Sequence, residues 1–354
     1  MSRDEIHPAA ACPSATAEDP AHRASPSQRL TGRWRSLRTL GVIALLVLFF
    51  LWEGQALAGA SPATSGIPAP LFSLIVFGVC CAIGFIAIIA GTGGGVLFTT
   101  LFLGFTSIHP DIVRATGLLA AVCGTRIGAR RYLRKGVANI RLVLLLGSCY
   151  ATFAVIGAVV GLVITRRFGH AGIACIKLTL GLIVMAVGAM YVFVKGMAYP
   201  EVEWVDLFTR RLGLGMAYWE ESLKQPIQYR VVRSFIGLLV VGGIGFVSGA
   251  LGLGAGWALT PLFNFVMLVP LKVAAATSAV IISLGDTAAV FPYLMSNSVF
   301  PVYAVPTIAG LILGAEIGSR IAVKVKARFI RLVLIAIMLG TGLKLIWTSV
   351  GDLL

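Results

Sequence analysis

Long apolar stretches alternate with short polar segments along most of this chain, and this pattern predicts helices that cross a membrane. Stretches near the roughly 20 residues needed to span a bilayer are expected at residues 71–90, 142–165, 171–194, 234–251, 301–322 and 329–349. A glycine-rich break follows residue 90, and a similar break follows residue 251. The pattern predicts an all-α polytopic membrane protein in which two helices are broken.

The two breaks repeat at a constant interval. They are Gly91-Thr92-Gly93-Gly94-Gly95 and Gly252-Leu253-Gly254-Ala255-Gly256, which lie 161 residues apart. The same step carries Ala115-Thr116 onto Ala276-Thr277, and Tyr132-Leu133 onto Tyr293-Leu294, without a gap. A constant step of this kind indicates an internal repeat. Paired interruptions at corresponding positions of two membrane repeats point to a transport site.

Each break is followed by a predicted hairpin. The first hairpin has two short arms, Val96–Phe105 and Ile112–Thr125; the second is Trp257–Gly285, followed by a loop at 286–300. Re-entrant backbone of this kind is tolerated only where protein buries it or where it lines a cavity. We therefore expect about seven full crossings, a first one at 39–58 included, plus two re-entrant, broken-helix hairpins.

The chain divides into five predicted regions. These are a disordered basic tail (1–38), a first membrane segment (39–58), a first membrane repeat (71–194), a cytoplasmic connector (195–232) and a second membrane repeat (233–349). Two interpretations of 39–58 stay open. It is either a transmembrane helix or the core of a signal peptide, because Ala56-Leu57-Ala58 fits a small-residue cleavage pattern.

The distribution of Lys and Arg predicts the orientation of the two repeats. Residues 126–141 hold six basic residues, while their counterparts 287–302 hold none. The next turn has the opposite bias, with basic residues concentrated at 320–331 rather than at 166–167. Since basic loops stay on the cytoplasmic side, matching loops should lie on opposite sides. The sequence therefore predicts an inverted repeat of two helical halves.

Composition excludes other classes of protein. The chain is 58% hydrophobic and 12% charged, too little charge to cover a soluble domain. Its net charge of +15 comes from basic residues at the ends of apolar segments, so no nucleic-acid partner is expected. The six cysteines and four histidines show no ligand spacing, so neither a metal nor another cofactor is expected. Membrane lipid is the expected surrounding; the oligomeric state stays open.

The breaks are the candidate substrate site. A helix start presents unpaired N–H groups and partial positive charge, so it can hold an anion without a formal cation. The expected binding residues lie in and beside the breaks: Gly91, Thr92, Gly93, Gly94, Gly95, Thr99, Ala115, Thr116, Gly252, Gly254, Gly256, Thr260, Thr277 and Ser278.

Three charged residues inside apolar segments are further candidates. Asp286 and Glu316 could carry a coupling proton, because ionisable groups within the membrane are functional by default. Glu316 could instead pair with Arg320, one helical turn away. Arg114 either attracts an anion or extends to the membrane interface.

At these motifs the chain resembles the TauE/SafE sulfite exporter family, also called the TSUP family. The resemblance spans about residues 70–349 and rests on Gly91–Gly95 with Ala115-Thr116-Gly117, and on Gly252–Gly256 with Pro261 and Ala276-Thr277-Ser278. It implies export of sulfite, or of an organosulfonate such as sulfoacetate, across the bacterial inner membrane. The second motif departs from the pattern at Ala255, and Pro261 stands where the first copy has Thr100. These departures leave the substrate open.

The sequence therefore favours a proton-coupled secondary transporter that exports a small sulfur-containing anion by alternating access. An anion channel with the same site is the alternative. A membrane-embedded enzyme is a third reading, but no cluster of catalytic side chains supports it.

Overall fold

In the computed structural model of the protein, the described residues are 69–90, 93–106, 108–193, 207–220, 225–321 and 327–353. They belong to one of two units of the chain, residues 61–354; the other unit is residues 1–60. The predicted tail, the predicted segment 39–58 and the break residues Gly91 and Thr92 lie outside the described residues.

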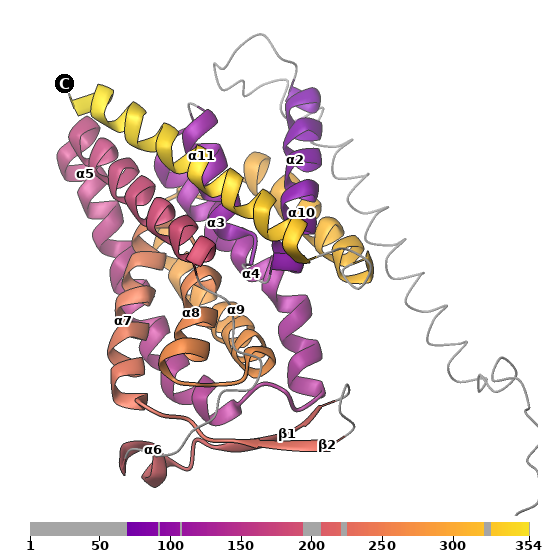
Figure 1. Cartoon of the computed structure of the whole chain (residues 1–354). Helices are drawn as coiled ribbons and strands as arrows, with labels where there is room; N and C mark the ends of the chain where they lie inside the picture. The colour runs from indigo at the N-terminus through magenta and orange to yellow at the C-terminus, as the bar shows by residue number, and fades with distance from the viewer. Residues whose placement is uncertain are drawn as a thin grey trace, which may run out of the picture. The chain divides into compact units, whose positions relative to one another are not determined.

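The described part is mainly helical (Figure 1). Its helices are α2 (Ala69–Ala90), α3 (Gly95–Phe105), α4 (Pro110–Arg134), α5 (Ile140–Phe193), α6 (Leu207–Leu212), α7 (Ser234–Leu251), α8 (Gly256–Pro261), the π-helix η3 (Leu262–Val266), α9 (Leu271–Met295), α10 (Pro301–Ile321) and α11 (Ala327–Leu353). Its strands are β1 (Met216–Glu220) and β2 (Gln225–Tyr229). Among the described residues, six helices are long and apolar enough to cross a membrane.

The second arm of each predicted hairpin is a full-length helix. Both α4 and α9 have 25 residues. The predicted end of the second arm of the first hairpin at Thr125 and the predicted loop at 286–300 are therefore wrong. Arginine is a good helix former, so the basic run after Thr125 continues α4 as far as Arg134. The chain turns only at Gly136, whose φ is 65°.

The helix boundaries follow the step of 161 residues. Helices α4 and α9 correspond at both ends, and α2 and α7 end at the equivalent residues Ala90 and Leu251. Helix α3 corresponds to α8 and η3 together. The change to a π-helix follows Pro261, which has no backbone N–H to donate to the preceding turn.

Helices of one repeat pack against helices of the other. Helix α2 lies on α10, and α7 lies on the first arm of α5. Glycine allows both contacts. A Cβ on Gly84 would lie 2.5 Å from the carbonyl oxygen of Leu311, and a Cβ on the equivalent Gly245 would lie 2.6 Å from that of Tyr150. Small residues let membrane helices approach closely, and the two repeats interleave as a result.

Helix α5 consists of two arms. Gly169 has φ 50° and ψ −122°, which no helical residue adopts, so the helix is interrupted there. This break lies in the turn that the sequence predicted between 142–165 and 171–194. Those two predicted helices are confirmed as separate arms.

The connector contains a β-hairpin. Strands β1 and β2 pair antiparallel, with Met216 opposite Tyr229. The prediction of an all-α chain is therefore wrong for this segment. The Asn139 side-chain amide donates to the Tyr229 hydroxyl at 2.9 Å and to the Leu214 carbonyl at 2.7 Å. Burial raises the pKa of Tyr229 to about 12, so its hydroxyl stays neutral. Figure 1 shows the hairpin beside α6, at one end of the helices.

Candidate functional site

The two glycine breaks meet inside the helical bundle. The Thr99 hydroxyl at the start of α3 donates to the Gly252 carbonyl in the second break, at 2.6 Å. A Cβ on Gly95 would lie 2.6 Å from the Leu253 carbonyl oxygen. Helix α4 packs against both breaks at Gly117, where a Cβ would lie 2.0 Å from the Thr99 hydroxyl. The candidate residues Gly95, Thr99 and Gly252 are thus in direct contact.

The backbone is special at equivalent positions of the two breaks. Gly93 and Gly254 have φ values of 78° and 66°, a region that only glycine adopts without strain. Helix α3 begins at Gly95, and no side chain caps this start among the described residues. Helix α8 likewise begins at Gly256 without a side-chain cap there. At the start of α3 the Gly95 N–H donates to the Gly93 carbonyl at 2.6 Å, so the N–H groups that remain for a partner outside the helix are those after it in the first turn.

The candidate hydroxyl groups bond to protein atoms in this conformation. Thr116 donates to the Ile112 carbonyl at 2.8 Å, within its own helix. Thr260 and Ser278 share a hydrogen bond of 2.8 Å. Thr277 accepts from the Asn139 backbone N–H at 3.1 Å, close to the connector rather than to the breaks. Ala115 is fully buried in the core.

A cavity of about 60 Å³ borders the first break. Gly93 and Gly94 form one wall, and the later turns of α4 form another, from Gly124 to Tyr132. Its other lining residues are Gly84, Ala87 and Ile88 of α2, Ala275 and Ala279 of α9, and Leu311 and Ala315 of α10. Roughly 10–15 Å³ holds one water molecule, so this cavity has room for several waters or one small oxyanion.

Of the residues that line the cavity, only Gly93 and Gly94 belong to the predicted site, and the polar side chains that the prediction missed are Thr125 and Tyr132. Tyr132 is 37% exposed and lies near the end of α4. A signal for it was present in the sequence, because Tyr132-Leu133 recurs as Tyr293-Leu294. Exposed Arg130 and Arg131 lie on the same turns of α4, so positive charge lies on the helix that forms this end of the cavity.

Asp286 lies beside the second break. It is fully buried within α9, not in a loop. Its Oδ1 accepts hydrogen bonds from the Tyr150 hydroxyl and, at 3.4 Å, from the Ser248 hydroxyl. Its Oδ2 has no hydrogen-bond partner among the described residues and lies 3.1 Å from where a Cβ on Gly254 would be. Nothing local in the sequence indicates Tyr150 or Ser248, because both are distant from Asp286 along the chain.

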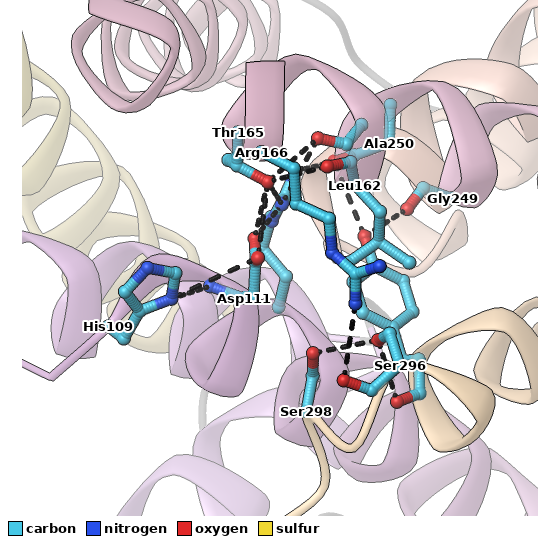
Figure 2. Close-up of polar contacts among 12 residues, drawn as sticks. His109, Asp111, Leu162, Thr165, Arg166, Gly249, Ala250, Ser296 and Ser298 are labelled. Atoms are coloured by element: carbon cyan, nitrogen blue, oxygen red, sulfur yellow. Dashed lines mark hydrogen bonds and ion pairs between the residues drawn. The ribbon is translucent and has the colours of Figure 1, made fainter. Parts of the chain in front are cut away.

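Arg114 does not extend to a membrane interface, so that expectation for it is wrong, whereas its attraction of an anion stays a prediction. It is fully buried and forms an ion pair with Asp111, one turn before it on α4. Its guanidinium also donates to the Ala250 carbonyl at the end of α7, at 2.7 Å. Figure 2 shows the carboxylate of Asp111 directed at the hydroxyl of Thr165, which lies 3.1 Å away. These bonds tie α4, α5 and α7 together beside the second break.

Glu316 lies at a different place from Asp286. Its carboxylate is 3.5 Å from the guanidinium of Arg131, and its side chain is 27% exposed. The alternative partner, Arg320, has a side chain outside the described part of the chain. Glu316 therefore joins α10 to the last turns of α4, near the exposed end of the cavity.

Known proteins resemble this chain over most of its length. The family model described as sulfite exporter TauE/SafE matches residues 74–345. The chain is 22% identical over 286 residues to the probable membrane transporter protein YunE of Bacillus subtilis. This alignment covers 78% of this chain and 97% of that protein. It is 26% identical over 240 residues to a probable membrane transporter protein of Haemophilus influenzae, covering 67% and 82% respectively. No solved structure matches the chain significantly.

The matched region contains both breaks, the cavity and Asp286. It also contains five of the six helices that are long and apolar enough to cross a membrane, and most of the remaining one, Leu71–Ile88. The chain is thus a multi-pass membrane protein and belongs to the TauE/SafE sulfite exporter family.

Proposed function

We propose that this protein is a secondary transporter that exports a small sulfur-containing anion, sulfite or an organosulfonate such as sulfoacetate, across the bacterial inner membrane. The observation that carries this proposal is the cavity beside the first break, which ends at the uncapped start of α3. The Gly95 N–H is already bonded to the Gly93 carbonyl, so a small oxyanion there would accept hydrogen bonds from the N–H groups that follow it in the first turn of the helix. The identity of the anion as a sulfur compound rests on the family.

The surroundings of the cavity fit an anion. Arg130 is exposed near its end and raises the local concentration of anions, whereas the neighbouring Arg131 is paired with Glu316. Most of the wall is glycine and alanine, so a ligand can approach the backbone closely. Thr125 adds a hydroxyl at the wall. The weak positive potential of a helix start suits a substrate that must also leave.

Contacts between α4 and α9 support an inverted arrangement of the two repeats. Residues 124–132, late in α4, share the cavity with Ala275 and Ala279, early in α9. Arg114, early in α4, lies 5.7 Å from the centre of the ring of Tyr293, late in α9. These contacts fit antiparallel helices, as two inverted halves require. Inverted repeats are a common basis for alternating access.

We assign proton coupling to Asp286 rather than to Glu316. Asp286 is fully buried, touches the second break and has one carboxylate oxygen without a partner among the described residues. Glu316 is partly exposed and has a basic partner, Arg131. A buried acid that gains and loses a proton can couple substrate movement to the proton gradient.

The test is uptake into inside-out vesicles that contain the full chain. Labelled sulfite, sulfoacetate, sulfate and thiosulfate are compared, each with and without an imposed pH gradient, and empty vesicles give the background. We expect sulfite or sulfoacetate to accumulate, and the pH gradient to increase the accumulation. If none of the four anions moves, the sulfur-anion proposal fails. Equal flux with and without the gradient would instead indicate a channel.

A further inference from the structure

The space that corresponds to the cavity in the other repeat is filled with side chains. Every residue that lines the cavity has a counterpart 161 residues away along the chain. All of these counterparts are buried. The repeat therefore places a second region, equivalent to the cavity, beside the second break, but this region is closed.

Three large residues fill that region, and we call them the plug: Arg114, Tyr150 and Tyr293. They are the three largest fully buried side chains in the described part of the protein. Arg114 stands where the cavity has Ala275, and Tyr150 stands where it has Leu311. Tyr293 is equivalent to Tyr132, yet the two differ in exposure, 0% against 37%.

Direct contacts pack the plug against the second break. The ring of Tyr150 covers Gly285, where a Cβ would lie 2.2 Å from a ring carbon. The Tyr293 hydroxyl donates to the Gly249 carbonyl at 2.9 Å, near the end of α7. Arg114 lies beside the ring of Tyr293 and bonds to the Ala250 carbonyl. Figure 2 shows Gly249 and Ala250 among the residues that form these contacts.

The polar groups of the plug are the kind that an anion pathway needs. Packing alone would need only apolar side chains in this region. Here it contains a guanidinium, whose Nε has no partner among the described residues, and two phenolic hydroxyls. These are hydrogen-bond donors. Once moved aside, they could line a passage for an anion.

We propose that Arg114, Tyr150 and Tyr293 close the second half of the anion pathway and must leave this region for substrate to cross. This inference rests on the proposed transport function, since it identifies the closed side of the same pathway. The open side is the cavity at the first break. The two sides use equivalent backbone and differ in the side chains at two of the three plug positions, Arg114 against Ala275 and Tyr150 against Leu311.

The test is thiol accessibility in a version of the full chain from which the six native cysteines have been removed. Ser248→Cys places a thiol beside the plug, and the equivalent Ala87→Cys places one at the cavity wall. A membrane-impermeant maleimide is added from each side in turn. In the parent chain we expect Ala87→Cys to react from one side, and Ser248→Cys to react from neither.

Two further variants exchange the residues found at one pair of equivalent positions, Tyr150 and Leu311. Tyr150→Leu copies Leu311 and should make Ser248→Cys reactive from the side opposite to that on which Ala87→Cys reacts. Leu311→Tyr copies Tyr150, so it should fill the cavity and slow the reaction of Ala87→Cys with the maleimide. If Tyr150→Leu elutes as folded protein and leaves Ser248→Cys unreactive, the proposal is overturned.

Leu311→Tyr gives a decision even if Tyr150→Leu does not fold, because it adds volume to an existing cavity. Reaction of Ala87→Cys at the parental rate in that variant also overturns the proposal. Labelling does not require transport, so the two proposals can fail separately. If labelling follows the prediction and no sulfur anion moves, only the substrate assignment fails. If anions move and labelling does not follow, only the plug assignment fails.

Discussion

The two glycine breaks occupy equivalent positions, yet one borders a cavity and the other borders a closed, polar region. Gly93 and Gly254 share the same left-handed backbone, and the helices around them end and begin at equivalent residues. The difference lies in a few side chains: Thr125 faces the first break where Asp286 faces the second. A repeat can therefore provide one backbone frame twice, while side chains at a few positions set which copy is open.

The largest expected effect concerns Asp286. With Asp286→Asn the side chain keeps its size but no longer exchanges a proton, so uptake in vesicles should lose its dependence on the pH gradient. Glu316→Gln is the matched control, since it also replaces an acid by its amide but lies at the exposed end of the cavity. Its gradient dependence should stay at the parental level. A full gradient response in Asp286→Asn would remove Asp286 from the coupling step.

Arg114→Ala should destabilise the fold strongly. It leaves the Asp111 carboxylate buried without its charged partner, which costs about 3–5 kcal/mol. Unfolding of the purified protein in detergent measures this cost. The double variant Asp111→Ala with Arg114→Ala should recover part of the loss, because no unpaired charge remains. A double variant that is as unstable as the sum of the two single variants would show that the ion pair does not couple them.

Substitutions at two equivalent glycines, Gly285 and Gly124, test the packing of the plug and should have smaller effects on stability. Gly285→Ala would place a Cβ 2.2 Å from the ring of Tyr150, whereas Gly124→Ala, at the equivalent position, meets nothing closer than 3.9 Å. We expect the first substitution to cost about 1–3 kcal/mol through overpacking. The second should stabilise α4 by up to about 1 kcal/mol. Equal stabilities of the two variants would contradict the closed packing around Tyr150.

The smallest expected effect concerns the two equivalent tyrosines. Tyr293→Phe removes the hydrogen bond to the Gly249 carbonyl and should cost about 0.5–1.5 kcal/mol of stability. Tyr132→Phe should change stability less, since Tyr132 is partly exposed and water can replace its contacts. Unfolding curves of both variants under the same conditions decide this. A larger loss for Tyr132→Phe would reverse the assignment of the open and the closed side.

The sequence predicted the backbone positions of the site better than its side-chain contacts. The 161-residue step anticipated that Gly93 and Gly254 occupy equivalent places, because it is a regular pattern along the chain. The contacts of Asp286 were not predictable, since Tyr150 and Ser248 come from other helices and have no local signal. The ion pair of Arg114 could have been anticipated from Asp111, which is three residues earlier on the same helix.

The end of α4 was mispredicted for a physical reason. A run of basic residues was taken as the end of a membrane arm, but arginine is favourable in a helix, and a charged helix end can extend beyond the membrane. The connector was predicted as a polar insert, and its β-hairpin depends on an anchor to Asn139 at the start of α5. Such long-range contacts are not visible in local sequence patterns.

The most direct measurement of the central claim is anion flux through a chain whose cavity has been filled. Ala279→Trp places a large side chain in the cavity, and Leu284→Trp, on the same helix but 61% exposed, is the matched control. Uptake of labelled sulfite and sulfoacetate is compared in inside-out vesicles with equal amounts of folded protein. We predict uptake at background for Ala279→Trp and at the parental rate for Leu284→Trp. Parental uptake through the filled cavity would contradict the proposal that the anion passes the first glycine break.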